Sequence, residues 1–299
     1  MLLAVPNFSE GRDRARIGPI STAFATGAAL LDTHSDLVHN RTVLTLSGPE
    51  KLLATALANG AHACVEEIDM RRHEGAHPCV GALDVCPVVW LRDPDRDAAR
   101  NEALAAARRI AAEAGVPVFL YGELASHMSR RERAFFRTGG IVELRRRVEA
   151  GELRPDFGPP RLHPTAGATL VTARPPLVAF NVELEGADLA EGREIAARLR
   201  ESGGRSGLPG VRAIGIDLGK GRVQVSANVH APVAVPLAEV VSRIRELAAP
   251  HGARVVAAEV VGLAPQAALA DWPRDIPLGD FDPAKHVIER RVAAHGEAS

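Results

Sequence analysis

Apolar and polar positions follow two different periods along residues 1–122, and the pattern predicts strands alternating with helices. Short apolar runs that predict strands lie at 1–7, 28–36, 41–48, 82–91 and 116–122. Amphipathic stretches that predict helices lie at 9–25, 48–69 and 93–115. Ser9 stands where its side chain could cap the first helix, and Pro49 suits the first turn of the second.

The C-terminal part of the chain, from residue 176, repeats a similar order. Strands are predicted at 176–184, 211–219, 222–230 and 253–262. Helices are predicted at 187–204, closed by Gly203, and at 236–252, opened by Pro236. A Gly-Lys-Gly turn joins the two middle strands as a hairpin. The resulting β-α-β-β-α-β order is the split βαβ arrangement.

Both parts of the chain begin with a strand that runs into asparagine, in "VPN" and "AFN". We therefore predict an α/β (α+β) fold of two ferredoxin-like, or split βαβ, subdomains, each a mixed or antiparallel sheet with helices packed on it. The boundary is predicted at Pro175 and Pro176, which gives subdomains 1–175 and 176–299. The sequence similarity between the two parts is too weak to prove a duplication.

Composition narrows the functional classes. Hydrophobic residues make up 46% of the chain and aromatic residues 4%, so alanine, valine and leucine must fill its cores. The formal net charge of −1 gives no electrostatic case for binding nucleic acid or an anionic membrane. The sequence shows no signal-peptide pattern, and no apolar stretch approaches the ~20 residues of a membrane span. Cys64, Cys79 and Cys86 fit reduced thiols in a cytoplasmic protein.

The stretch "HEGAHPCVGALDV" at 73–85 contains H-E-x-x-H, the signature of zinc metalloproteases. Zinc ligation by both histidines requires a helix, but Gly75 weakens one and Pro78 pushes His77 out of helical geometry. Two readings other than zinc stay open, a loop with two solvated histidines and a loop with one working histidine. We expect no metal site, and we expect the working histidine to be His77.

Two further polar stretches fall where loops are expected, "PNFSEGRD" and "PDFGPPRLHPTAGAT". With the histidine stretch they carry a family resemblance. The chain resembles the formiminotransferase family, the glutamate formimidoyltransferases, in six stretches spread in family order. They are "VPNFSEGRD", "NRTVLTLSGP", "IDMRRHEGAHPCVGALDVCP", "VPVFLYGE", "PDFGP" and "AGATLVTARPPLVAFNVEL".

The resemblance implies a folate-dependent enzyme of histidine degradation. Members move a formimidoyl group from N-formimidoyl-L-glutamate to N5 of tetrahydrofolate, with the histidine of the "HP" dipeptide, here His77, as the catalytic residue. It also implies a dimer of chains whose two α/β subdomains bind the substrates in a groove between them. Some animal members carry a fused cyclodeaminase domain, which a chain of 299 residues has no room for. The folate-contacting loop corresponds to Gly158, Pro159, Pro160, Arg161, Leu162, His163, Pro164, Thr165, Ala166 and Gly167.

The chemistry of the residues agrees with this reaction. Formimidoyl transfer needs a group that takes a proton from the incoming nitrogen and gives one to the outgoing nitrogen, and histidine titrates near neutral pH. Asp84 could orient the ring of His77, hold a cationic amidine, or serve only as a turn residue. Both substrates carry carboxylates, so arginines are expected near the site. The candidate substrate contacts are Asn7, Arg41, Arg72 and Asp84, and further arginines near the matched stretches are Arg161 and Arg174. The remaining histidines that we interpret as structural or surface residues are His34, His39, His62 and His127.

The chain departs from the family beside His77. The family usually reads "GEHPR" where this chain has Ala76 and Cys79, so one charge of each sign is missing. Three alternatives to the main reading follow. The protein could act on another folate one-carbon unit or another amidine, it could use Cys79 as a thiol nucleophile, or it could bind folate without catalysis.

Overall fold

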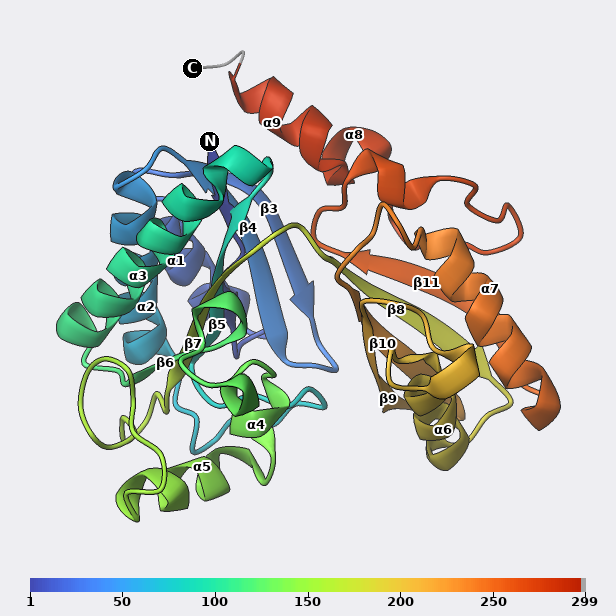
Figure 1. Ribbon diagram of the computed structural model, residues 1–299, viewed down its shortest axis with the longest axis horizontal. Coiled ribbons are helices and arrows are strands. Elements are labelled where there is room, and N and C mark those ends of the chain that lie inside the picture. Colours follow the sequence, from blue (N-terminus) through green and yellow to red (C-terminus); the bar gives the residue numbers. More distant parts are fainter. Residues whose placement is uncertain (297–299) are drawn as a thin grey trace. The chain divides into compact units, whose positions relative to one another are not determined.

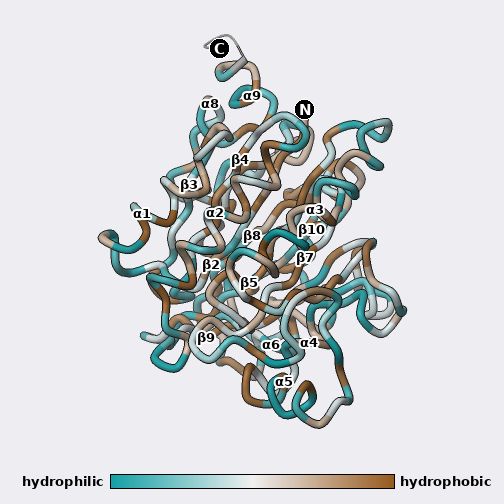
Figure 2. Tube along the Cα trace, turned by 90° about the vertical axis from the view of Figure 1, so that its left-hand side faces the viewer, coloured by the Kyte–Doolittle hydropathy of each residue, from teal (hydrophilic) through white to brown (hydrophobic). Residues whose placement is uncertain are grey.

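The computed structural model describes residues 1–296, and these form two compact units, unit 1 and unit 2, that meet between Pro175 and Pro176 in the sequence (Figure 1). Each unit has a sheet and a core of its own, so each is described by itself. Figure 2 shows hydrophobic residues concentrated on the interior strands, with hydrophilic residues on outer turns such as those beside α5. This distribution is what burial of apolar surface requires of a globular chain.

The sheet of unit 1 has seven strands. They are β1 (Leu2–Ala4), β2 (Asn7–Phe8), β3 (Ala29–Asp36), β4 (Arg41–Gly48), β5 (Leu83–Trp90), β6 (Val118–Leu120) and β7 (Thr169–Arg174). Both β1 and β2 lie between β4 and β5 and are antiparallel to them, so they are two pieces of one strand. Pro6 separates the pieces, because proline has no N–H to donate to a sheet. The spatial order is β3, β4, β1/β2, β5, β7 and β6, with β5, β7 and β6 parallel.

Three helices pack on one face of this sheet and on one another, namely α1 (Arg14–Phe24), α2 (Leu52–Glu67) and α3 (Arg96–Glu113) (Figure 1). Small side chains allow the close packing. A Cβ at Gly60 of α2 would lie 2.1 Å from the ring of Phe24, so only glycine fits there. A second cluster with Phe119 and Phe136 involves α4 (Ala134–Arg137) and α5 (Gly140–Glu149).

Unit 2 has the order predicted for a split βαβ domain. Its strands are β8 (Val178–Glu185), β9 (Val211–Gly219), β10 (Arg222–Val229) and β11 (Arg254–Val261), and its helices are α6 (Leu189–Leu199), α7 (Leu237–Ala248), α8 (Pro283–His286) and α9 (Ile288–Gly296). The strands run in the order β11, β8, β10, β9, and every neighbouring pair is antiparallel. Asp188 and Glu191 form a capping box that starts α6.

The predicted fold class is confirmed, since both units are sheets with packed helices and unit 2 has the ferredoxin-like strand order. In unit 1, strands β3, β4, β1/β2 and β5 follow the same plan, and β7 and β6 extend it. Of this extension, β6 was predicted as the strand at 116–122, whereas β7 was missed because it follows a long irregular loop. The short helices α4, α5, α8 and α9 were missed as well. Short 3-10 helices occupy Asp93–Asp95, Gly122–Leu124, Met128–Arg130, Gly204–Ser206, Ala249–His251 and Gln266–Leu269.

Two local predictions were wrong. Ser9 does not cap α1, because the helix begins at Arg14 and the side chain of Asp13 accepts from the N–H of Ala15. Pro49 does not lie in the first turn of α2, which begins at Leu52 after Lys51 in a left-handed conformation. The displaced helix start leaves Ser9 free for the site described next, where its hydroxyl donates to the carbonyl oxygen of Gly81 (2.8 Å).

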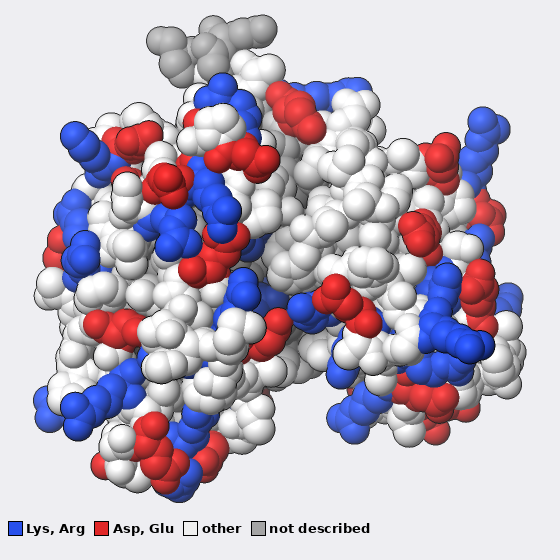
Figure 3. Space-filling model, viewed as in Figure 1, with Lys and Arg blue, Asp and Glu red and all other residues white. Residues whose placement is uncertain are grey.

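Charged side chains of both signs are interspersed on the face of each unit that Figure 3 shows. This agrees with the near-neutral net charge of −1. Within residues 1–296, no helix is long and apolar enough to cross a membrane.

Candidate functional site

Three polar side chains meet where the first strand of unit 1 is interrupted. Asn7 begins β2, Arg41 begins β4 and Asp84 is the second residue of β5. The Arg41 guanidinium donates to the Asn7 amide oxygen (3.1 Å from Nε and 2.9 Å from one Nη) and to the Asp84 carboxylate (2.6 Å from the other). Arg41 is therefore fixed by side chains from β2 and β5, and three of the four predicted contact residues form one network.

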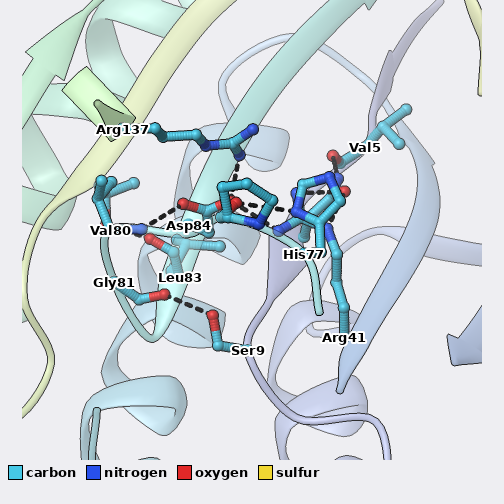
Figure 4. Close-up of polar contacts among 12 residues, drawn as sticks. Val5, Ser9, Arg41, His77, Val80, Gly81, Leu83, Asp84 and Arg137 are labelled. Carbon is cyan, nitrogen blue, oxygen red and sulfur yellow. Dashed lines mark hydrogen bonds and ion pairs between the residues drawn. The ribbon is translucent and has the colours of Figure 1, made fainter. Parts of the chain in front are cut away.

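Asp84 is fully buried and stands at the centre of this network (Figure 4). One carboxylate oxygen accepts from Arg41 and from Arg137 of α4, and the other accepts from the backbone N–H of Val80 (2.9 Å). Burial by itself would raise the pKa of Asp84, but Arg137 and Arg41 lower it below its usual range. Asp84 is therefore a buried anion held by two cations, and the reading of it as a mere turn residue was wrong.

His77 lies beside this network in a loop without helical structure (Figure 4). Its Nδ1 lies 2.8 Å from the carbonyl oxygen of Pro78. A carbonyl oxygen only accepts, so Nδ1 carries the proton and the lone pair is on Nε2. Burial, with the nearby charges of Arg41 and Arg137, lowers the pKa of His77 well below its usual range. At neutral pH the ring is thus a neutral base with a defined tautomer.

His39, read from the sequence as structural, contacts the candidate catalytic histidine. The rings of His39 and His77 are 5.8 Å apart and nearly perpendicular. His39 is buried, and its Nδ1 lies 3.0 Å from the carboxylate of Asp36, which also accepts from the backbone N–H of His39. One feature of the sequence could have pointed to His39. It lies in the polar turn between the predicted strands 28–36 and 41–48, directly before the family-matching stretch that contains Arg41.

The end of the predicted folate loop is hydrogen-bonded to the loop of His77. Backbone bonds join Ala82 to Ala166 (2.8 Å) and Ala168 to Val80 (3.0 Å). Gly81 and Gly167 are paired as well, and a Cβ at Gly81 would lie 2.0 Å from a backbone oxygen, so this close approach requires glycine. The structure thereby brings residues 163–167 next to the segment of His77 and Asp84.

The side chains of this loop are of three kinds. Leu162 and Ala166 are buried, Gly158, Pro160, Arg161 and Pro164 are exposed, and Pro159, His163 and Thr165 are half-buried. The Nδ1 of His163 accepts from the N–H of Ala166 (3.0 Å), so this histidine caps the turn through that nitrogen.

Cys79 is half-buried close to Asp84 and Ser9. Burial and the negative charge of Asp84 raise the pKa of the Cys79 thiol. A nucleophilic cysteine requires the thiolate, and this environment favours the protonated thiol. The geometry therefore gives no support to the thiol nucleophile considered from the sequence.

Comparison with known proteins agrees with this site. A family model described as the N-terminal subdomain of the formiminotransferase domain matches residues 1–174, and one described as the formiminotransferase domain matches residues 179–274. The chain belongs to the formiminotransferase family. The predicted family and the predicted enzyme class, a transferase, are thereby confirmed.

Several curated relatives of this formiminotransferase match over long ranges. This chain is 37% identical over 292 residues to the glutamate formimidoyltransferase of Streptococcus pyogenes serotype M1, and the match covers 96% of this chain and 97% of the relative. It is 35% identical to the glutamate formimidoyltransferase of Thermoplasma acidophilum, covering 96% of both chains. A formimidoyltransferase-cyclodeaminase of Sus scrofa is 40% identical over 89% of this chain, which spans 50% of that longer protein.

A pocket of about 380 Å³ lies in unit 1, and Ser9 is one of its lining residues. Arg72 and His73 line it, together with Glu10, Asn40 and Thr165. Arg72 is therefore separate from the Asp84 network, unlike the other predicted contacts.

His73 and His77 lie in irregular backbone and not on one helical face, and residues 1–296 contain no cluster of three side chains suited to a metal ion.

Two arginines of the formiminotransferase site were missed from the sequence. Arg137 binds Asp84 directly, and Arg133 lies one helical turn before it. Both belong to the segment of α4, which had not been predicted as a helix. A four-residue helix has no hydrophobic periodicity to detect, so its arginines looked like surface residues.

Proposed function

We propose that this transferase moves a formimidoyl group from N-formimidoyl-L-glutamate to N5 of tetrahydrofolate, as a step of histidine degradation, with His77 as general acid and base. The observation that carries the proposal is the state of His77. Its tautomer is set by the Pro78 carbonyl, its pKa is depressed, and it lies beside a buried Arg41–Asp84 pair. Two relatives of nearly full length are named glutamate formimidoyltransferases, which supports the same substrates.

The reaction requires proton transfer between two nitrogens. N5 of tetrahydrofolate attacks the amidinium carbon and forms a carbon–nitrogen bond, which gives a tetrahedral intermediate with three nitrogens. Nε2 of His77 takes the proton that N5 must lose. The same proton then passes to the glutamate nitrogen, whose bond to carbon breaks, and glutamate leaves as the amine. Tetrahydrofolate accepts the transferred group and is therefore a co-substrate. Protons and electron pairs balance between the two substrates and His77, so the proposed reaction requires no metal or redox cofactor.

The low pKa of His77 keeps the ring neutral before the first step and makes its imidazolium a stronger acid for the second. A histidine surrounded by cations is neutral at rest, so it is ready to accept a proton. The imidazolium that forms is destabilised by those cations and donates its proton readily to the leaving nitrogen. Asp84 is the anion of this network, and it keeps Arg41 and Arg137 in place during the cycle.

The other predicted residues receive positioning and binding roles. Asn7 and Asp84 hold Arg41, and we propose that the loop 158–167 contacts the folate, with Arg72 at the neighbouring pocket. We further propose that residues 1–175 form the catalytic subdomain and 176–299 its C-terminal companion, in a cytoplasmic homodimer.

A direct assay tests the proposal. Purified protein is treated with a chelator and mixed with tetrahydrofolate and N-formimidoyl-L-glutamate, and 5-formimidoyltetrahydrofolate is followed by its absorbance. We expect turnover that survives chelation. Absence of turnover with this donor, together with turnover of another formimidoyl amine or another folate one-carbon unit, would give the protein a different substrate. Binding of tetrahydrofolate without any turnover would make it a folate-binding protein.

A further inference from the structure

The charges around Asp84 do not balance. Arg41 and Arg137 both donate to Asp84, and their side chains are only 9% and 10% exposed. A third guanidinium, that of Arg133, lies close enough to both arginines and to Asp84 to interact electrostatically with them. Three arginines thus surround one carboxylate, which leaves a surplus of two positive charges beside His77.

Arg133 is the member of this group without a partner. Neither a hydrogen bond nor an ion pair is made by its side chain within residues 1–296, whereas Arg41 and Arg137 use theirs on Asn7 and Asp84. Asp84 makes no bond to Arg133, and three of the roughly four acceptor positions of its carboxylate already bind Arg41, Arg137 and the N–H of Val80. A half-buried guanidinium without a counter-charge is costly, and such groups are normally paired.

The position of Arg133 directs it toward the reacting atoms. Arg133 precedes Arg137 by four residues, and the backbone N–H of Arg137 donates to the carbonyl of Arg133 (3.1 Å). Residues four apart in a helical turn lie on the same side, so Arg133 faces the side on which Arg137 reaches Asp84. The charge of Arg133 also contributes to the field at His77, which places it near the proton-transfer group.

We propose that Arg133 binds a carboxylate of the formimidoyl donor. This inference rests on the function proposed above and names one residue that recognises its substrate. A guanidinium binds a carboxylate through two parallel hydrogen bonds, and a site with surplus positive charge selects a donor that carries carboxylates over one that lacks them.

Tetrahydrofolate also carries carboxylates, but its chemistry fits this position less well. The α-carboxylate of the donor is attached to the carbon that bears the reacting nitrogen, so it must lie close to His77 during transfer. The carboxylates of tetrahydrofolate lie at the far end of the molecule, beyond its aminobenzoyl group. An arginine near His77 is therefore placed for the donor, and the experiment separates the two sources.

The test compares Arg133→Gln with a matched control, Arg131→Gln, which removes an exposed arginine two residues away. We expect Arg133→Gln to raise the KM for N-formimidoyl-L-glutamate about 10–100-fold, with a small change in kcat and in the KM for tetrahydrofolate. Arg131→Gln should leave all three unchanged. A rise in the KM for tetrahydrofolate alone would assign Arg133 to the folate, and a fall in kcat alone would remove it from binding.

Donor analogues identify the carboxylate. Each of the two carboxylates of the donor is replaced in turn by a carboxamide, and both analogues are assayed with wild type and with Arg133→Gln. The analogue that lacks the partner of Arg133 should be a poor substrate for wild type and should lose little further in the variant. If both analogues lose as much as the parent donor in the variant, Arg133 does not contact a carboxylate.

Direct binding separates failure of this inference from failure of the proposed function. L-Glutamate is titrated calorimetrically into wild type and into Arg133→Gln, each saturated with tetrahydrofolate. If wild type lacks formimidoyl transfer but binds L-glutamate, and the variant binds it at least tenfold more weakly, the carboxylate site stands without the reaction. Equal binding by both proteins, or no binding by either, would overturn the inference.

Discussion

In unit 1 the asparagine of the first strand, Asn7, accepts two hydrogen bonds from Arg41, whereas in unit 2 the asparagine of the first strand, Asn181, donates one to Glu259 (3.0 Å). The strand of unit 1 is broken by Pro6, and the break is followed by a buried cluster of charges. The strand of unit 2 runs without interruption from Val178 to Glu185 and pairs along its whole length.

The two units share a strand order, but only in unit 1 does an interrupted first strand lie beside a buried cluster of charged side chains. A continuous antiparallel strand uses its backbone groups on its neighbours and leaves little room for irregular loops. The interruption at Pro6 releases part of that pairing, and Asn7, Ser9 and their neighbours use the space for side-chain bonds. Local departures from regular structure are common at functional sites. They are stable only where contacts elsewhere in the fold compensate for them.

The largest effect is expected from His77→Ala, which tests whether the chemistry belongs to unit 1. Removal of a general acid and base typically lowers the rate ~10²–10⁴-fold, so we expect kcat to fall by that amount, with folate affinity and the unfolding midpoint nearly unchanged. His73→Ala is the matched control, because His73 lines the neighbouring pocket and is four residues away. A His77→Ala enzyme within a few-fold of wild type would remove His77 from the mechanism.

Asp84→Asn should lower the unfolding free energy more than a change at the Asn181–Glu259 bond of unit 2 does. The change keeps the shape of the side chain but leaves Arg41 and Arg137 without their anion, and breaking a buried pair in this way typically costs about 3–5 kcal/mol of unfolding free energy. Glu259→Gln in unit 2 alters the partly buried bond from Asn181, and we expect a loss of about 0.5–1.5 kcal/mol. Denaturant unfolding measures both, and equal losses would contradict the contrast.

The sequence predicted the parts of unit 1 that have a clear period and missed those set by distant contacts. Strands 29–36 and 41–48 were found because their apolar positions are regular. Arg137 and Arg133 were missed because their helix is short and only its contact with Asp84 distinguishes them from surface arginines. His77 was selected through the family resemblance of its "HP" dipeptide, and its catalytic role stays a prediction. His39 was set aside because its contact with His77 crosses 38 residues of chain.

The pH dependence should sharpen the picture of His77 as a neutral base among cations. Because the pKa of His77 is lowered, the acid limb of kcat/KM should have its midpoint below the usual histidine value of about 6.5. Arg133→Gln removes one nearby cation and should move the midpoint to higher pH, whereas Arg131→Gln should not move it. A wild-type midpoint at or above 6.5 would contradict the charged surroundings described here.

The same shift has a consequence for stability. Between about pH 6.5 and the lower pKa of folded His77, the unfolded chain binds a proton at this residue that the folded chain does not. The contribution of His77 to the unfolding free energy therefore decreases as the pH falls through this window. Comparing the pH dependence of unfolding for wild type and His77→Ala isolates that contribution.

The smallest effect is expected from Cys79→Ser, although Cys79 lies only two residues from His77. Burial and Asp84 raise the pKa of its thiol, so almost no thiolate is present at neutral pH, and the thiol cannot serve as the nucleophile. Serine is close to cysteine in size, and turnover should stay within a few-fold of wild type. Alkylation of Cys79 by iodoacetamide should likewise be slow at pH 7 and accelerate only in alkaline solution. A rate loss of 10²-fold or more in Cys79→Ser, with fast alkylation at pH 7, would instead indicate a covalent thiol intermediate, and proton transfer by His77 alone would no longer account for the reaction.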